Sequence, residues 1–124
     1  QPYSRNHCMK VAVYGTLKRG HGNHRVMGDS KFLGTHVTDP AYTMYSTGGF
    51  PIVCTHGDTA IHVEVFEVEK GNLQRIYSLE GYTGIRNHKD NWYNTVEIQT
   101  PYGQAEMFVM SETKHLTKIE SGLW

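Results

Sequence analysis

Alternation of apolar and polar residues predicts that most of this chain forms short β-strands. The alternation is clearest from Ile61 to Val68, where apolar residues at 61, 63 and 65 are separated by polar residues at 62 and 64. Shorter apolar and β-branched runs predict further strands at 10–14, 32–38, 42–46, 92–100 and 104–110, with an apolar triplet at 52–54. The turn-forming segment 101–103 lies between the last two strands and favours a hairpin.

One segment, Asn72 to Glu80, has the period of an α-helix. Leu73, Ile76 and Tyr77 are spaced three and four residues apart, so they form one apolar stripe. The first residue of the segment suits the N-cap position, and the glycine directly after it suits the position that follows a helix end. Six or seven short strands with one helix indicate a β-rich α+β domain, built as a small barrel or a strongly curved sheet.

The chain has 124 residues, which is enough for one compact domain. Residues 1–8 lack the apolar core of a signal peptide, and Met9 opens a well-patterned strand. We therefore expect residues 1–8 to be an N-terminal extension or a cloning remnant, and residues 9–124 to form a single domain.

The charge, the apolar content and the number of cysteines exclude several classes of protein and of binding partner. Twelve basic and twelve acidic residues give a formal net charge of zero, which argues against binding nucleic acid or a membrane surface through a general basic patch. Apolar residues make up 38% and charged residues 19%, which excludes a disordered chain, and no apolar run approaches the ~18 residues of a membrane-spanning helix. The two cysteines are far apart and form no CxxC pattern, so we expect a reducing, cytoplasmic location.

Glu80 breaks the pattern of the predicted helix and is the first candidate for chemistry. The helical period puts it on the same stripe as Leu73, Ile76 and Tyr77 although its carboxylate is polar. It also stands at the carboxyl end of the helix, where the helix dipole disfavours a negative charge. Both features raise the pKa of a carboxylate and suit a general base. The alternative is a frayed last turn that exposes Glu80 to solvent.

The second candidate is the loop from Tyr14 to Gly20, which begins where a buried strand ends. Successive backbone amides in such a turn can bind an anion. The glycine spacing does not match a phosphate-binding P-loop, and no long helical pattern follows. Taken alone, the segment is explained better by an ordinary strand-to-loop turn with a solvated Lys18 and Arg19.

Eight histidines raise the question of a metal site. His21 and His24 are three residues apart beside this loop, and the others are scattered along the chain. No HExxH motif, Cys/His cluster or suitably spaced carboxylate accompanies them. We therefore expect no metal site.

Four sequence blocks, taken in order, resemble one known family. They are Tyr14-Gly15-Thr16-Leu17-Lys18-Arg19-Gly20 with the nearby Asn23-His24-Arg25-Val26, then Gly49-Phe50-Pro51-Ile52-Val53, Val63-Glu64-Val65-Phe66-Glu67-Val68 and Leu79-Glu80-Gly81-Tyr82. They are similar to the motifs of the gamma-glutamylcyclotransferase-like proteins, and most similar to those of the gamma-glutamylamine cyclotransferase branch. The resemblance spans residues 10–110, which is nearly the whole chain.

This resemblance implies a small mixed β-barrel with short flanking helices and a pocket beside the first loop. It implies that Glu80 is the catalytic general acid/base. It also implies a substrate site in which the backbone amides of 15–17 hold substrate oxygens, lined by Tyr14, Gly15, Thr16, Leu17 and Tyr93. Because that loop would face the pocket rather than the core, we expect a side chain added at Gly15 to obstruct the ligand with little loss of stability.

The chain departs from the family pattern in two places. The family's Tyr-x-Arg motif reads Tyr93-Asn94-Thr95 here, so its arginine is absent. The segment 83–91 is longer and more polar than the family resemblance leads us to expect. It could reshape the pocket rim and change the choice of substrate. Trp92 and Tyr93 suit either stacking on a ligand or packing in the core.

The reaction that the resemblance implies closes a ring within the substrate. The α-amino group of a gamma-glutamyl compound attacks its own side-chain carbonyl, which gives 5-oxoproline and a free amine without a cofactor. The expected partner is therefore a small gamma-glutamyl amine or peptide, with no nucleic acid or membrane involved. The alternative is a non-catalytic module on the same fold that binds a small ligand or another protein.

Overall fold

The computed structural model describes residues 8–110 and 116–124, which contain eight β-strands, one α-helix and one short 3-10 helix. The strands are β1 (Cys8–Val13), β2 (Lys31–Val37), β3 (Tyr42–Ser46), β4 (Pro51–Thr59), β5 (His62–Glu69), β6 (Asn94–Thr100), β7 (Gly103–Val109) and β8 (Thr117–Lys118). The helices are the 3-10 helix η1 (His24–Met27) and the α-helix α2 (Lys70–Glu80). This order agrees with the predicted series of short strands interrupted by one helix.

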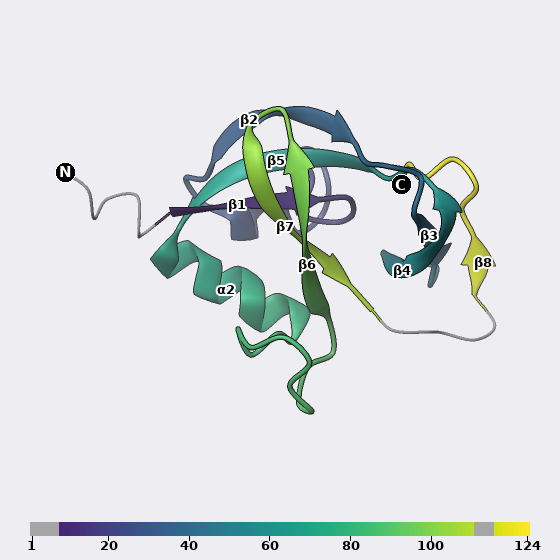
Figure 1. The fold of residues 1–124 in the computed structure, drawn as a ribbon. Coiled ribbons are helices and arrows are strands. Elements are labelled where there is room, and N and C mark those ends of the chain that lie inside the picture. Colours follow the sequence, from purple (N-terminus) through teal and green to yellow (C-terminus); the bar gives the residue numbers. More distant parts are fainter. Residues whose placement is uncertain (1–7, 111–115) are drawn as a thin grey trace.

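The described strands form two sheets rather than one closed barrel. The larger sheet has the order β2-β5-β1-β7-β6, and the smaller sheet has the order β4-β3-β8. Paired strands are antiparallel except β1 and β7, which run parallel. The predicted α+β class is confirmed, while the predicted barrel corresponds only to the strong twist of the larger sheet above α2 (Figure 1).

The second half of β1, residues 11–13, is buried on both faces, which explains its apolar Val-Ala-Val sequence. Val11 packs in a cluster that includes Ile76 of α2, while Ala12 packs in a second cluster that includes Met44 of the smaller sheet. Successive residues of a strand point to opposite faces, so one short run supplies both clusters. The loop that follows β1 therefore begins deep in the molecule.

The two ends of α2 differ in how well they were predicted. Glu69, rather than Asn72, is the N-cap residue. Asn72 lies within the helix, and its side-chain amide donates hydrogen bonds to the Met27 carbonyl (2.6 Å) and the Ser30 hydroxyl (3.3 Å), which ties α2 to η1. Gly81 ends the helix in a left-handed conformation (φ 66°), which confirms the predicted C-terminus.

The smaller sheet holds the main differences from the predicted strands. Strand β4 continues to Thr59, far past the predicted triplet 52–54, and β8 has no counterpart in the prediction. Strand β8 has only two residues, which is too short to show the alternation of apolar and polar residues that predicts a strand. The predicted hairpin is confirmed, with Thr100 paired with Gly103 at the turn between β6 and β7.

Most of the predicted N-terminal extension, residues 1–7, lies outside the described residues. Cys8 is the first residue of β1 and pairs with Glu69 of β5. The division of the chain into an extension (1–8) and a domain (9–124) therefore stays a prediction. Within the described ranges, no helix has the length and apolar character needed to cross a membrane.

Candidate active site

A cavity of about 340 Å³ lies where β1, β4 and α2 approach one another. Its volume is near the lower end of the range common for small-molecule sites. The wall is built from the end of β1 with the loop after it, the turn before β4, the end of α2 and the segment before β6. The lining residues are Ala12, Val13, Tyr14, Gly15, Thr16, Leu17, Asn23, Gly49, Phe50, Pro51, Leu79, Glu80, Trp92, Tyr93 and Phe108.

Glu80 is the only charged residue among the described residues that line this cavity. It is the last residue of α2, four residues after Ile76 and three after Tyr77, both of which are buried. The same helical stripe therefore carries its carboxylate into the cavity wall. Burial raises the pKa of Glu80 to about 7, and no hydrogen bond or ion pair from the described residues offsets that effect.

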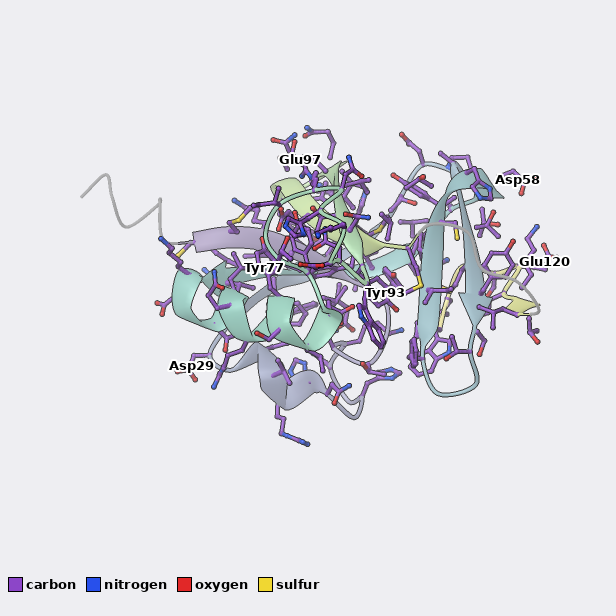
Figure 2. The ribbon with its side chains drawn as sticks, turned by 90° about the horizontal axis from the view of Figure 1, so that it is seen from below. Asp29, Asp58, Tyr77, Tyr93, Glu97 and Glu120 are labelled. Atoms are coloured by element: carbon purple, nitrogen blue, oxygen red, sulfur yellow. The ribbon has the colours of Figure 1, made fainter. Side chains whose placement is uncertain are left out.

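Two buried tyrosines lie near Glu80. The Tyr14 hydroxyl donates a hydrogen bond to the Phe108 carbonyl (2.8 Å), and the Tyr93 hydroxyl donates one to the Pro51 carbonyl (3.3 Å). Burial raises the pKa of Tyr14 well above its ordinary value, with smaller contributions from Tyr93 and Glu80. Burial, followed by the charge of Glu80, also raises the pKa of Tyr93, which lies between the helix-covered sheet and the smaller sheet (Figure 2). Both hydroxyls therefore stay protonated at neutral pH.

The loop after β1 turns its carbonyl groups toward Asn23 and His24. The Thr16 carbonyl accepts a hydrogen bond from the Asn23 amide (2.9 Å), and the Leu17 carbonyl lies 2.9 Å from Nδ1 of His24. The backbone amides of Gly15, Thr16 and Leu17 have no acceptor in the part of the chain that the structure describes. Three successive amides with unused hydrogen-bonding capacity in a cavity wall can bind a carboxylate or an oxyanion.

Gly15 packs against the smaller sheet as well as lining the cavity. A Cβ atom at this position would lie 2.7 Å from Cγ and 2.8 Å from Cδ of Pro51. These distances are far shorter than the ~3.5 Å at which carbon atoms pack favourably. The expectation that a side chain at Gly15 costs little stability is therefore wrong, because the loop rests directly on the first residue of β4.

The segment between α2 and β6 is closed at its base by two backbone hydrogen bonds. The Trp92 amide donates to the Gly81 carbonyl (2.8 Å), and the Tyr93 amide donates to the Glu80 carbonyl (3.3 Å). Residues 83–91 do not line the cavity, whereas the adjoining Trp92 does. The influence of 83–91 on the rim and on the choice of substrate stays a prediction, and Trp92 is the residue that joins this segment to the cavity.

Arg86 of this segment reaches the strand position at which the Tyr-x-Arg pattern lacks its arginine. Its Nε donates a hydrogen bond to the Thr95 hydroxyl (3.0 Å). Its Nη2 lies 3.6 Å from a carboxylate oxygen of Glu97 and 3.8 Å from one of Glu106. Glu106 is buried and also accepts a hydrogen bond from the Tyr77 hydroxyl. A guanidinium thus reaches this corner of the sheet from a loop instead of from the strand.

The residues predicted to form the site all line this one cavity. They are Glu80, Tyr14, Gly15, Thr16, Leu17 and Tyr93. The prediction did not include Phe50 and Leu79, and it left Trp92 undecided between ligand and core. Helical period places Leu79 beside the buried stripe rather than on it, and Phe50 belongs to a turn without any period. A signal for both was present, because Phe50 and Leu79 each fall in one of the four blocks that resemble the family.

The described residues contain no group of three or more His, Cys, Asp or Glu side chains that could hold a metal ion. Two histidines near the loop have structural contacts instead. His24 bonds to the Leu17 carbonyl, and the ring of His21 lies 5.5 Å from that of Trp124. Within the cavity, Glu80 is the group whose protonation changes near neutral pH, because its pKa is about 7.

Comparison with known proteins gives a consistent match over the chain. A family model described as "Gamma-glutamyl cyclotransferase, AIG2-like" matches residues 11–124. A Vibrio cholerae protein provisionally named a gamma-glutamylcyclotransferase is 34% identical over 115 residues, covering 92% of this chain and 93% of that protein. The gamma-glutamylcyclotransferase family protein YtfP of Escherichia coli K12 is 33% identical over 117 residues, covering 94% of this chain and 96% of YtfP.

The fold is matched as well as the sequence. The crystal structure of the uncharacterized protein PH0828 from Pyrococcus horikoshii superposes with a TM-score of 0.75 at 30% identity. The match covers 93% of this chain and 88% of that one. The arrangement of strands around α2 is therefore shared across nearly the full length of both proteins, while the resemblance to the gamma-glutamylamine branch stays a prediction.

Proposed function

The chain belongs to the gamma-glutamyl cyclotransferase, AIG2-like family, and from this premise we propose that it converts a gamma-glutamyl amine or peptide into 5-oxoproline and the free amine. The observation that carries the proposal is the position of Glu80. Its carboxylate lines the cavity together with the loop whose three amides have no acceptor among the described residues, and burial raises its pKa to about 7. A base and an anion-binding loop thus share one small cavity.

The proposed reaction needs few groups because the nucleophile is part of the substrate. The α-nitrogen attacks the γ-carbonyl carbon, a C–N bond forms to close a five-membered ring, and the C–N bond to the leaving amine breaks. Holding a flexible chain in its cyclising conformation replaces a bimolecular encounter with an intramolecular one. The cavity, rather than a side-chain nucleophile, supplies this conformation.

In this proposal Glu80 moves the protons. Its carboxylate accepts a proton from the α-ammonium, which frees the lone pair that attacks the carbonyl. As the tetrahedral intermediate collapses, the leaving nitrogen receives that proton, and a second proton lost by the ring nitrogen follows the same route. Two protons leave the α-nitrogen and two reach the leaving amine, so Glu80 ends ionised as it began.

The amides of Gly15, Thr16 and Leu17 are proposed to stabilise negative charge on the substrate. They can hold the α-carboxylate or the oxyanion that develops on the γ-carbonyl oxygen. Each preorganised donor to an oxyanion is often worth ~3 kcal/mol of barrier. Tyr14 and Tyr93, which stay protonated, add no negative charge at the same wall, and their hydroxyl protons are donated to the Phe108 and Pro51 carbonyls.

We propose that no metal or organic cofactor takes part and that the protein works in the cytoplasm. The chemistry is proton transfer and acyl transfer within one molecule, so neither a redox group nor a Lewis acid is required. Treatment with EDTA is expected to leave the rate of 5-oxoproline release unchanged. Activity that is lost in EDTA and restored by one metal would contradict this part of the proposal.

The test is a panel of gamma-glutamyl amines, gamma-glutamyl amino acids and glutathione, scored by 5-oxoproline release. We expect release from at least one compound, and release that is slower by ~100-fold or more with the Glu80→Gln variant. Saturable binding of panel members without any 5-oxoproline would support the alternative, a non-catalytic binding module. That outcome would overturn the enzymatic proposal.

A further inference from the structure

The mouth of the cavity exposes large hydrophobic side chains. Among the described residues, the exposed large hydrophobics are Met9, Val37, Phe50, Leu79, Ile85, Trp92 and Leu123. Three of these seven line the cavity: Trp92 is 78% exposed, and Phe50 and Leu79 are each 44% exposed. They come from three separate segments, so their meeting at one opening is a property of the fold.

Trp92 is held at this opening by the backbone around it. Its amide donates to the Gly81 carbonyl at the end of α2. A Cβ at Gly81, which has φ 66°, would lie 2.9 Å from Cβ of Trp92, so the indole side chain rests against a position that only glycine fits well. The backbone contacts of Trp92 therefore hold its side chain in an exposed position. An exposed apolar patch next to a cavity indicates a binding surface.

Charged side chains are sparse in the described lining of this opening. Glu80 is the one charged residue among the described residues of the lining, and the proposed reaction uses its charge for the substrate's α-ammonium. A leaving group that carries a carboxylate, such as an amino acid or a peptide, would meet no cation among the described residues that line the cavity. Partial desolvation of that carboxylate would then be offset by no opposite charge from these residues.

We propose that the substrate's leaving group is a neutral, apolar amine that packs on Trp92, Phe50 and Leu79. This inference rests on the proposed function and names its substrate class. The γ-glutamyl part lies inside the cavity against Glu80 and the loop amides, and the amine substituent extends through the mouth. Gamma-glutamyl arylalkyl and branched alkyl amides are therefore the preferred substrates, ahead of gamma-glutamyl amino acids and glutathione.

The first experiment compares substrates that differ only beyond the scissile bond. Gamma-glutamylbenzylamide carries an apolar ring, gamma-glutamylphenylalanine adds a carboxylate to a similar ring, and gamma-glutamylethylamide removes the ring. An amide of a diaminobutane adds a cation. We expect kcat/KM for the benzylamide to exceed each of the others by about 10-fold, the ratio that corresponds to ~1.4 kcal/mol of transition-state binding. Equal values, or a preference for either charged compound, would overturn the inference.

The second experiment changes the mouth. In Trp92→Ala the ratio of kcat/KM for benzylamide to ethylamide is expected to fall by about 10-fold. Ile85→Ala is the matched control, because Ile85 is exposed on the adjoining loop but does not line the cavity. A ratio that is unchanged in Trp92→Ala, or lowered equally by both variants, would contradict the assignment.

Two further readings separate this inference from other outcomes. If no compound releases 5-oxoproline, the proposed function fails. Calorimetry with the Glu80→Gln variant then tests the apolar mouth separately: tighter binding of the benzylamide than of gamma-glutamylphenylalanine would support it, and equal or weaker binding would overturn it. If all compounds react equally, the function stands and the inference fails. Ultracentrifugation that finds a dimer which Trp92→Ala dissociates would assign the patch to a second copy of the chain and overturn the inference.

Discussion

Glu80 acquires its raised pKa from its position rather than from a specific neighbour. Ionised carboxylates are costly in poorly hydrated surroundings, and burial is the cause of the shift to about 7. The last turn of α2 adds no basic residue that could lower this value. A carboxylate with a pKa near neutrality can both accept and return a proton at physiological pH, as the proposed reaction requires.

Glu80→Gln is expected to lower kcat by ~100-fold or more while the protein stays folded. Glutamine keeps the shape and polarity of the side chain but cannot accept the proton. The matched control is Glu120→Gln, an exposed residue beyond the smaller sheet from Tyr93 (Figure 2), which is expected to retain full activity. Near-normal turnover of folded Glu80→Gln would end the assignment of Glu80 as the base.

The pH dependence of kcat/KM follows from the same pKa. Because the base must be ionised, activity is expected to rise with pH along an acidic limb with a midpoint near 7. A pH–rate profile of the wild-type protein measures this midpoint. An acidic limb centred near the usual glutamate value of 4.5 would show that another group, or an unperturbed Glu80, controls the rate.

Stability has the opposite dependence on pH. The pKa of Glu80 in the folded protein, about 7, lies above the ordinary glutamate value of 4.5, so between these pH values the unfolded chain binds fewer protons than the folded one. The free energy of unfolding therefore falls as pH rises through this window, by an amount on the order of 3 kcal/mol. Glu80→Gln is expected to be more stable than wild type at pH 8 and equally stable at pH 4, as measured by denaturant unfolding.

At the scale of elements, the segment between α2 and β6 joins the candidate base to the cavity rim. Its base is closed by hydrogen bonds from Trp92 and Tyr93 to the last residues of the helix. Its far side is fastened by Arg86, which contacts Thr95 on β6 and the buried Glu106 on β7. One arginine from the loop thus connects the rim to two strands.

Arg86→Ala is expected to loosen this segment. The variant removes the hydrogen bond to Thr95 and the cation near Glu106, at a cost of roughly 1 kcal/mol because Arg86 is partly exposed. Amides of 83–91 should then exchange hydrogen faster, and KM should rise because Trp92 is held less firmly. Lys89→Ala, an exposed change in the same loop, serves as the control. Unchanged exchange in Arg86→Ala would show that the loop is held by its base alone.

At the scale of the whole molecule, the cavity depends on how the two sheets meet. The loop after β1 belongs to the larger sheet, and Pro51 begins a strand of the smaller one. Gly15 lets these two segments touch, and the Met110 amide donates to the Val53 carbonyl (2.9 Å) across the same junction. The floor of the site and its wall are therefore fixed by contact between sheets.

Gly15→Ala is expected to destabilise the fold by ~1–3 kcal/mol, the usual cost of overpacking. Its added Cβ would collide with the Pro51 ring. Pro51→Ala removes the two ring atoms concerned, so the double variant should recover part of the loss. Thermal unfolding of both single variants and the double variant gives the coupling energy. Strictly additive losses would show that the two residues do not oppose each other.

Periodicity identified most elements correctly because strands and helices carry their pattern locally. The stripe of Leu73, Ile76 and Tyr77 predicted that Glu80 lies on the buried side of the helix. The alternation of apolar and polar residues in β5 predicted which side of that strand is buried. The N-cap was wrong since the Asn72 amide bonds to the distant Met27 carbonyl, a contact 45 residues away in sequence. Strand β8 was missed because two residues pair only through the neighbour that the fold provides.

The sequence by itself determined the α+β class, the single α-helix with its end at Gly81 and, through resemblance, six of the residues that line the cavity. The tertiary structure alone decided that Glu80 is buried enough to have a raised pKa, that Pro51 packs on Gly15 and that Arg86 reaches Thr95. It also decided that Phe50, Leu79 and Trp92 share one opening. The physical reason is range: hydrophobic period and turn chemistry act between near neighbours, whereas desolvation and steric fit depend on atoms brought together from distant segments.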